Sequence, residues 1–411
     1  MLLKPKLKDT VAIPKSPILC VIPFLVACGD EGSPAAAPAV RDSAGVRIVE
    51  SLAAAWSPAE AWRVATSPQF DIGGAEGDPT QQLFGVVDAA RLSDGRIVVA
   101  NGGSQELLFY DTAGDHLLTA GGRGGGPGEF QSMRWVELAG DSLLVADRQP
   151  STLAVFNLRG GFVRSERYEA AAPVGRFADG SVLATQTDFF EDLQDGLFRP
   201  PSTLLRLGSD GEAADTLGSA PGNEGFLRVG DQMVSVFRLP FARQTWTIVR
   251  GETFYVADSD RYEIGVYGID GSLQASIRRS FENLVATEAD LDVYIESRIS
   301  AAGDNEARRE AARGLRVFPM PETFPAFGWN VTGRAAPVLI DDLGNLWVLE
   351  YNRPGDEEYR WSVYDPAGGL LGEVTFPVVL EPMHIGDDFV LGKWRDDLDV
   401  EHVLLYELIK P

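Results

Sequence analysis

"ARLSDGRIVVANGGSQELLFYDTAGDHLLTAGG" (residues 90–122) contains four short apolar runs separated by polar turns. A second stretch, "VELAGDSLLVADRQPSTLAVFNLRGGFVRSERY" (136–168), repeats the order strand, tight turn, strand ending in Asn or Asp, polar loop, strand, turn, strand. Alternating apolar residues bounded by Asp-Gly or Gly-Asn turns are typical of β-hairpins. The two stretches therefore predict two similar four-stranded units.

Weaker copies of this unit follow along the chain. They begin near residues 174, 245, 337 and 383 and bring the count to six units of roughly 40 residues each. Repeated four-stranded units of this length are typical of a β-propeller. We therefore expect an all-β chain folded as a six-bladed β-propeller.

The last unit lacks an outer strand, and the N-terminal part of the chain offers one. The sixth unit stops after three strands at Leu408-Ile409, whereas "WRVATSPQFDIGG" (62–74) resembles an outer strand without inner strands of its own. Pairing 62–74 with 401–409 would leave no open edge between the first and last blades. The sequence thus predicts a propeller closed by an N-terminal outer strand.

The glycine-rich stretch "GGRGGGPGEF" (121–130) follows the outer strand of the first unit. It lacks the Lys-Ser/Thr of a P-loop and the spacing G-x-G-x-x-G, and degenerate copies at 73–84 and 217–226 indicate a structural turn. Together with the "LSDGRIVVAN" units, it resembles the bacterial six-bladed β-propeller lipoproteins related to NHL-repeat proteins, over residues 62 to 409. The resemblance implies the fold and no particular chemistry.

The N-terminus has the features of an export signal. Four lysines precede an apolar run over 17–27 that is long enough for a signal-peptide core and too short to span a bilayer. Leu25-Val26-Ala27-Cys28 resembles the bacterial lipobox, whose cysteine receives a diacylglycerol. An ordinary signal peptide cut nearby, or a start codon set too far upstream, are the alternatives.

These features divide the chain into three expected parts. Residues 1–27 are predicted to be a lipoprotein signal peptide, 28–45, rich in Gly, Pro, Ala and Ser, a flexible tether, and 46–411 the propeller. Lipidation of Cys28 would place the protein in the bacterial cell envelope, with the propeller in the periplasm or at the cell surface.

Composition excludes several classes of function. Both cysteines, Cys20 and Cys28, lie in or at the end of the leader, so no disulfide or thiolate metal site is expected in the propeller. The chain has a net charge of −24, and without the leader 32 basic residues (36 less four) face 59 acidic ones (60 less one). This charge repels nucleic acid and anionic lipid head groups, so contact with the membrane is expected only through the lipid on Cys28.

Two insertions interrupt the repeats. The first, about residues 284–316 between blades four and five, predicts a helix capped by Thr287 and Asp290, with Leu291, Tyr294, Ile295 and Ile299 on one face. The second, 228–244, precedes the inner strand of blade four. Both are expected at the ligand-exposed end of the ring, as a cap over the channel or as a packing ornament.

Polar side chains follow the second strands of several units and form the candidate site. The carboxylates are Asp147, Asp258 and Glu350, the guanidiniums are Arg148, Arg261 and Arg395, and Tyr351 adds an aromatic ring. Such a ring around a channel mouth could bind a small polar, zwitterionic or sugar-like ligand by charge-assisted hydrogen bonds. Alternatively, the same residues fix turns and brace neighbouring blades.

Catalytic motifs are scarce. Only three histidines occur, and the chain has neither H-E-x-x-H nor G-x-S-x-G. We expect a lipid-anchored scaffold that binds a ligand or an envelope protein, without a metal site or cofactor. A metal-assisted hydrolase or lyase of the lactonase kind stays open, because carboxylates and amides suffice to bind Ca²⁺ in the channel.

Overall fold

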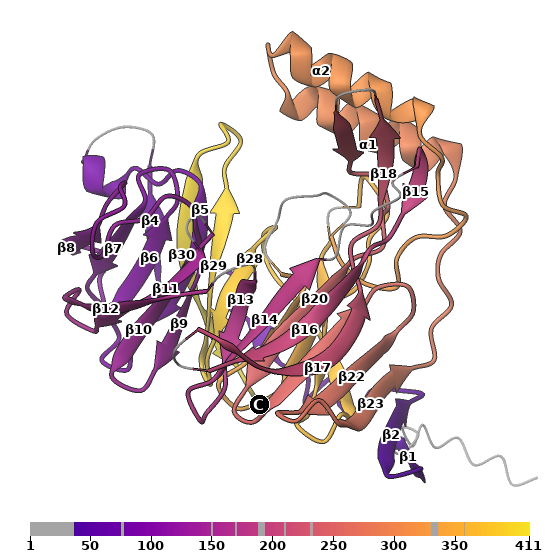
Figure 1. Cartoon of the computed structure of the whole chain (residues 1–411), viewed down its shortest axis with the longest axis horizontal. Helices are drawn as coiled ribbons and strands as arrows, with labels where there is room; N and C mark the ends of the chain where they lie inside the picture. Colours follow the sequence, from indigo (N-terminus) through magenta and orange to yellow (C-terminus); the bar gives the residue numbers. More distant parts are fainter. Residues whose placement is uncertain are drawn as a thin grey trace, which may run out of the picture. The chain divides into compact units, whose positions relative to one another are not determined.

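Short strands joined by tight turns make up most of the described chain (Figure 1). The computed structural model describes residues 37–411 except 75–77, 149–150, 169–170, 188–193, 209–210, 231–232, 330–335 and 357. They belong to one compact unit, Ala35–Pro411, and the predicted signal peptide and Cys28 lie outside the described residues. Within these ranges, no helix has the length and apolar character needed to cross a membrane.

Four sheets consist of four antiparallel strands that follow one another in chain order. Sheet I contains β5 (Val86–Arg91), β6 (Ile97–Asn101), β7 (Glu106–Tyr110) and β8 (His116–Gly121). Sheet II contains β9 (Met133–Ala139), β10 (Ser142–Arg148), β11 (Ser151–Asn157) and β12 (Phe162–Arg167). Sheet III contains β13 (Ala172–Arg176), β14 (Val182–Thr187), β16 (Pro201–Leu207) and β17 (Ala213–Pro221). Sheet V contains β24 (Val338–Ile340), β25 (Leu346–Leu349), β26 (Arg360–Tyr364) and β27 (Leu370–Thr375).

Two further sheets are extended by strands from the N-terminal part of the chain. Sheet IV contains β20 (Thr245–Arg250), β21 (Thr253–Asp258), β22 (Glu263–Gly268) and β23 (Leu273–Arg279), followed by β2 (Val46–Ser51) and β1 (Ala39–Ser43). Sheet VI contains β28 (Glu381–Ile385), β29 (Phe389–Arg395) and β30 (Glu401–Ile409), and both β3 (Arg63–Val64) and β4 (Phe70–Gly73) pair with β30. The expected pairing of 62–74 with 401–409 is therefore present.

Residues 39–73, which we call the N-terminal belt, follow the outer strands of three sheets. β2 pairs in parallel with β23 of sheet IV. The backbone N–H groups of Ala55 and Trp56 then donate to Leu370 and Leu371 of β27 in sheet V, at 3.0 and 2.7 Å. The belt ends on sheet VI, where Ile72 of β4 lies opposite Val403 of β30.

The belt corrects one sequence-based boundary. Composition predicted a flexible tether up to residue 45, but residues 39–43 are a strand. This strand forms because β2 buries Ile48 and Val49 against sheet IV, and the turn at Ala44-Gly45 lets β1 fold back onto β2. Both turn residues have positive φ, as hairpin turns of the primed type require.

Asp-Gly turns close the hairpins as the repeats predicted. In sheet I, the Asp94 carboxylate accepts a hydrogen bond from the backbone N–H of Arg96 at 3.2 Å. Gly95 has φ +88°, and a Cβ atom there would come within 2.9 Å of Thr112. Glycine is therefore required at this turn.

Apolar clusters join the sheets face to face. In the described residues, one cluster lies between each consecutive pair of sheets from I to VI. A further cluster joins sheet VI to sheet I, with Leu391 and Val403 packed against Ile97 and Val99. Small antiparallel sheets packed face to face in this way define a β-propeller.

A separate layer, which we call the overhang, lies at one end of the sheets (Figure 1). Between β23 and β24 the chain forms α1 (Glu288–Ala301), α2 (Glu306–Arg313) and the 3-10 turn η2 (Gly314–Val317), and α1 has the expected Thr287–Asp290 capping box. β15 (Gly196–Phe198), β18 (Gly225–Val229) and β19 (Val234–Phe237) form a small sheet. Phe318 packs on Phe226 and Phe237, with ring centroids 5.3 and 5.0 Å apart, and so joins the two parts. A short 3-10 turn, η1 (Pro79–Gln81), precedes sheet I.

Candidate functional site

Asp147, at the end of β10, braces the loop that enters its own sheet. Its carboxylate accepts hydrogen bonds from the backbone N–H groups of Gln131 and Ser132, at 2.6 and 2.8 Å, and the residue is buried. Asn101, at the same place in sheet I, accepts from the N–H of Phe84 at 2.9 Å. These side chains hold the loops that lead into β9 and β5.

Glu350 joins sheet IV to sheet V. One of its carboxylate oxygens accepts from Tyr262 and from Arg279 at 2.7 Å each, and from Ser362 at 2.5 Å. Burial raises the pKa of Glu350, while the Arg279 guanidinium opposes this shift. Arg279 also donates to Glu373, so this buried group is part of a network that holds the two sheets together.

Tyr351 lies under helix α1. Its ring stacks on Phe324 at 5.1 Å, in an apolar cluster that includes Leu291 and Tyr294 of the helix. The neighbouring Arg353 donates to both carboxylate oxygens of Asp290, at 3.0 and 2.9 Å. Tyr351 and Arg353 together hold α1 against sheet V.

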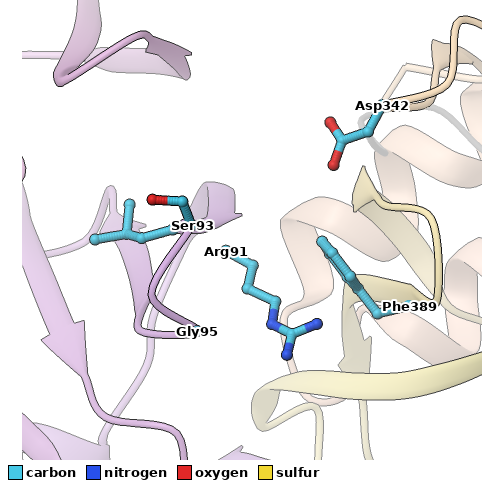
Figure 2. Close-up of a pocket in the computed structure, with 6 residues that line it drawn as sticks. Arg91, Ser93, Gly95, Asp342 and Phe389 are labelled. Atoms are coloured by element: carbon cyan, nitrogen blue, oxygen red, sulfur yellow. The ribbon is translucent and has the colours of Figure 1, made fainter.

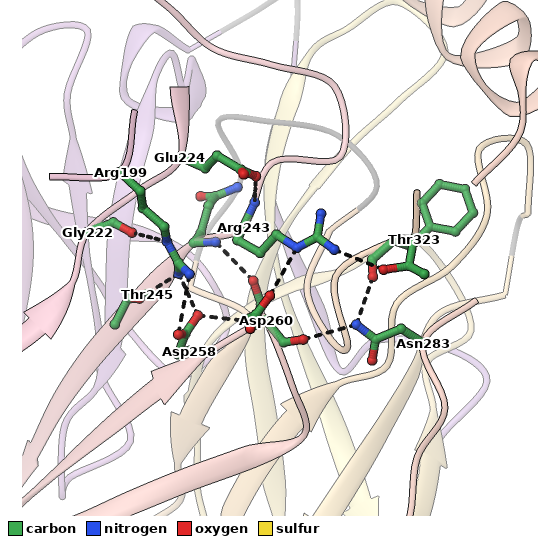
Figure 3. A network of polar contacts seen from close by, with 12 residues as sticks. Arg199, Gly222, Glu224, Arg243, Thr245, Asp258, Asp260, Asn283 and Thr323 are labelled. Carbon is green, nitrogen blue, oxygen red and sulfur yellow. Dashed lines mark hydrogen bonds and ion pairs between the residues drawn. The ribbon is translucent and has the colours of Figure 1, made fainter. Parts of the chain in front are cut away.

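Asp258 belongs to a polar network that joins sheet IV to the overhang (Figure 3). Arg199, which precedes sheet III's β16, forms an ion pair with Asp258 and donates to the carbonyl of Gly222 at 2.8 Å. Arg243 contacts Asp260 at 3.4 Å and donates to Thr323 at 2.9 Å. Arg199 and Arg243 were not among the predicted site residues. Arg243 lies in the insertion 228–244, which was its available signal, whereas Arg199 lies outside both insertions.

The three predicted arginines have different surroundings. Arg395 forms an ion pair with Glu401 at 2.7 Å, and Glu401 itself accepts from the N–H of Val86. Arg148 and Arg261 are exposed, and within the described ranges their side chains have no hydrogen bond or ion pair. Burial lowers the pKa of Arg134, and the guanidinium of Arg148 lowers it further.

Five of the seven predicted residues thus belong to separate clusters, and within the described ranges Arg148 and Arg261 belong to none. Among the described residues, no hydrogen bond or ion pair links the Asp147, Asp258 and Glu350 clusters to one another. Each carboxylate instead stabilises a loop, a joint between sheets or the attachment of the overhang.

Two carboxylates on the first strands of sheets I and II were not foreseen. Asp88 accepts from the N–H of Val136 on sheet II at 2.9 Å, and Glu137 accepts from the N–H of Arg176 on sheet III at 3.3 Å. Burial raises the pKa of both carboxyl groups to about 7. Each side chain links its sheet to the next; acidic residues inside apolar runs were the sequence signal.

A shallow pocket of about 250 Å³ lies beside the turns that follow the first strands of sheets I, V and VI. Arg91, Ser93, Asp342 and Phe389 line it, as Figure 2 shows. The Arg91 guanidinium lies over the Phe389 ring, 4.6 Å from its centroid. This polar but open pocket could hold only a small ligand.

Both ring nitrogens of His384 contact residues that line this pocket. Nδ1 accepts from the backbone N–H of Arg91 at 3.0 Å, and Nε2 lies 3.2 Å from the Asp342 carboxylate. The hydrogen bond from His384 holds the pKa of Asp342 below its usual value. In this arrangement neither nitrogen is free to take a proton from a substrate. Across the described ranges, no three His, Cys, Asp or Glu side chains are placed to hold a metal ion together.

The overhang exposes apolar side chains. On the small sheet and η2, the exposed residues are Leu197, Val229, Met233, Val234, Val236 and Val317. Val229, Val234 and Val236 share one face of the small sheet, and Leu197 lies on the other face with Arg228. There the Arg228 guanidinium lies 5.8 Å from the ring centroid of Phe237 and 5.7 Å from that of Phe318. Exposed apolar groups that share a face, as the three valines do, mark interaction surfaces.

Solved structures with a similar fold share little sequence identity with this chain. A Bacteroides fragilis protein described as exported matches with a TM-score of 0.51 at 11% identity, over 89% of this chain and 99% of that one. Virginiamycin B lyase from Staphylococcus aureus matches with a TM-score of 0.38 at 10% identity, over 79% of this chain and 95% of the lyase. Regucalcin, a calcium-binding protein from Agrobacterium tumefaciens, matches with a TM-score of 0.37 at 10% identity, over 81% of this chain and 93% of regucalcin. No protein-family profile and no curated protein sequence matches the chain.

Proposed function

We propose that this chain is an exported, lipid-anchored six-bladed β-propeller that serves as a binding scaffold for another envelope protein. The clusters that join sheets I to VI in a cycle support six blades, with the helices of the overhang inserted between the fourth and fifth. The lysine-rich leader and Leu25-Val26-Ala27-Cys28 support anchoring in the cell envelope.

The observation that carries the scaffold role is the exposed apolar surface of the overhang. Val234 and Val236 on β19 and Val229 on β18 expose apolar surface to solvent, outside the apolar clusters that join the sheets. Covering such area contributes roughly 25 cal/mol per Å² to binding a partner. The polar residues first considered as a ligand site are instead engaged in internal bonds at Asp147, Asp258 and Glu350.

A metal-assisted hydrolase or lyase is the second candidate, and Asp88 and Glu137 favour it. Carboxyl groups with a pKa of about 7 on neighbouring first strands have the acidity suited to general acid–base catalysis near neutral pH. Metal analysis of chain 29–411 tests this candidate. One bound Ca²⁺ per chain that is lost in Asp88→Asn would favour the metal-assisted enzyme. A metal-free chain without hydrolase activity would contradict it.

Site-specific photo-cross-linking in the bacterium that makes the protein tests the scaffold role. A photoreactive residue replaces Val236 on β19 or, as a control, Val163 on β12; the two valines are 54% and 55% exposed on edge strands. A discrete adduct with one envelope protein from position 236, absent from position 163, supports the proposal. No adduct, or the same adducts from both positions, contradicts it.

A further inference from the structure

β19 is the open edge of the small sheet. The strand order is β15-β18-β19, and in the described part of the chain no strand pairs with the outer side of β19. Its sequence, Val-Ser-Val-Phe, contains no charge or proline, the usual devices that protect an edge. The edge strands β1 and β12 do carry charged residues.

The hydrogen-bond pattern directs backbone groups of β19 outward. The N–H of Gly230 donates to the carbonyl of Met233 at 2.9 Å, so Gly230 and Met233 are the hydrogen-bonded pair that closes the hairpin. Hydrogen-bonded and non-hydrogen-bonded pairs alternate along an antiparallel ladder. The pairs Val229–Val234 and Leu227–Val236 are therefore non-hydrogen-bonded, and the N–H and C=O groups of Val234 and Val236 point away from β18.

The side chains beside this edge are apolar on one face. Val229 lies opposite Val234, and Leu227 lies opposite Val236, so these four side chains share that face. Leu227 is buried, whereas the three valines are exposed. A strand added to β19 would cover the exposed valines with its own alternate side chains.

The other face carries one cation beside aromatic rings. Arg228 lies opposite Ser235, and its guanidinium lies 5.8 Å from the ring centroid of Phe237 and 5.7 Å from that of Phe318. Within the described residues Arg228 has no carboxylate partner, although the whole chain has a net charge of −24. This face therefore suits carboxylates on an incoming strand.

We propose that β19 binds an extended segment of a partner protein as an added β-strand, with apolar residues at alternate positions and acidic residues between them. This inference rests on the scaffold function and specifies its partner. The outward backbone groups of Val234 and Val236 would supply the hydrogen bonds, the valine face the apolar contact, and Arg228 the preference for acid.

Peptide binding to chain 29–411 tests the strand addition. The probes are fluorescein-labelled peptides of about eight residues, one alternating valine and glutamate and one alternating valine and lysine, with binding read as fluorescence anisotropy. A third probe is the glutamate peptide with its N–H groups methylated along one edge. We expect binding of the glutamate peptide at least tenfold tighter than binding of the other two.

Charge reversal locates the site. Arg228→Glu should weaken the glutamate peptide at least tenfold and strengthen the lysine peptide, while Arg164→Glu on edge strand β12 should change neither; unchanged melting temperatures confirm folding of both variants. The proposal would be overturned if the two variants had equal effects or if the N-methylated glutamate peptide bound as tightly as the unmodified one. It would also be overturned if the glutamate peptide did not bind at 1 mM. If position 236 still cross-links to a partner, the scaffold function stands and only strand addition fails; without an adduct both fail.

Discussion

Truncation of Ile72 measures how much the belt stabilises the join between sheets VI and I. Ile72 is fully buried in the cluster that contains Leu391 and Val403 of sheet VI and Val99 of sheet I. Replacement by alanine removes three carbon atoms, each worth about 0.8 kcal/mol when buried. The cavity left behind raises the expected loss in the free energy of unfolding to about 3 to 4 kcal/mol.

Urea unfolding of chain 29–411 measures this loss, and Leu117→Ala is the control. Leu117 lies on β8 and is 48% exposed, so the same three-carbon truncation there should cost less than about 1 kcal/mol. A double variant with Val403→Ala should be non-additive by at least about 0.5 kcal/mol, because the two side chains face each other across β4 and β30. Equal losses for Ile72→Ala and Leu117→Ala would refute the role of β4 in closing the ring.

Three other perturbations probe the joints and the anchor. Arg279→Ala leaves the buried Glu350 without its cation and should lower the free energy of unfolding in urea by about 3 kcal/mol. The control Arg261→Ala should change it by less than about 0.5 kcal/mol, and similar losses in the two variants would mean that Glu350 does not depend on Arg279. Asp88 and Glu137 have a folded pKa of about 7, above the unfolded value near 4, so their contribution to stability is full below pH 4 and is lost as pH rises through 7. Between pH 5 and pH 8, the free energy of unfolding should therefore fall less in Asp88→Asn than in the unmodified chain, and an identical dependence on pH would contradict this. Cys28→Ser should abolish incorporation of labelled fatty acid and release the protein from membranes, and continued labelling would show that Cys28 is not the acylation site.

The strands of the propeller were predictable because their signals are local. Alternation in Ile97-Val98-Val99 and the Asp94-Gly95 turn specify a hairpin within a few residues. The closing strand was predictable for another reason: a sixth unit with three strands has one open position, and 62–74 resembles an outer strand without inner strands of its own. Counting elements therefore supplied a contact between distant parts of the chain.

Strands that join a sheet as additional members were missed. β2 pairs with β23, more than two hundred residues away, and no unit of the repeat lacks a strand there. β15 pairs with β18 across the whole of β16 and β17, so the insertion at 228–244 gave no indication of a sheet. Such pairings depend on packing of the finished fold and leave no periodic signal.

The candidate site was less predictable than the fold for a similar reason. Asp147 and Glu350 both come at the end of a second strand, yet one holds backbone N–H groups of a loop and the other an arginine of a neighbouring sheet. Position in the repeat indicates where a carboxylate lies but not which donors surround it. Asp88 and Glu137 escaped notice because single acids in apolar runs resemble ordinary strand residues.

The route of the N-terminal belt determines how a chain held at Cys28, as proposed, would respond to a mechanical pull. Tension would reach β1 and β2 on sheet IV first, then the Ala55–Trp56 contact on sheet V, and only afterwards the closing strands on sheet VI. Releasing residues 39–62 would add up to roughly 80 Å of slack while β4 stayed in place. The belt would thus detach strand by strand under force, which lengthens the tether before the contact between sheets VI and I is broken.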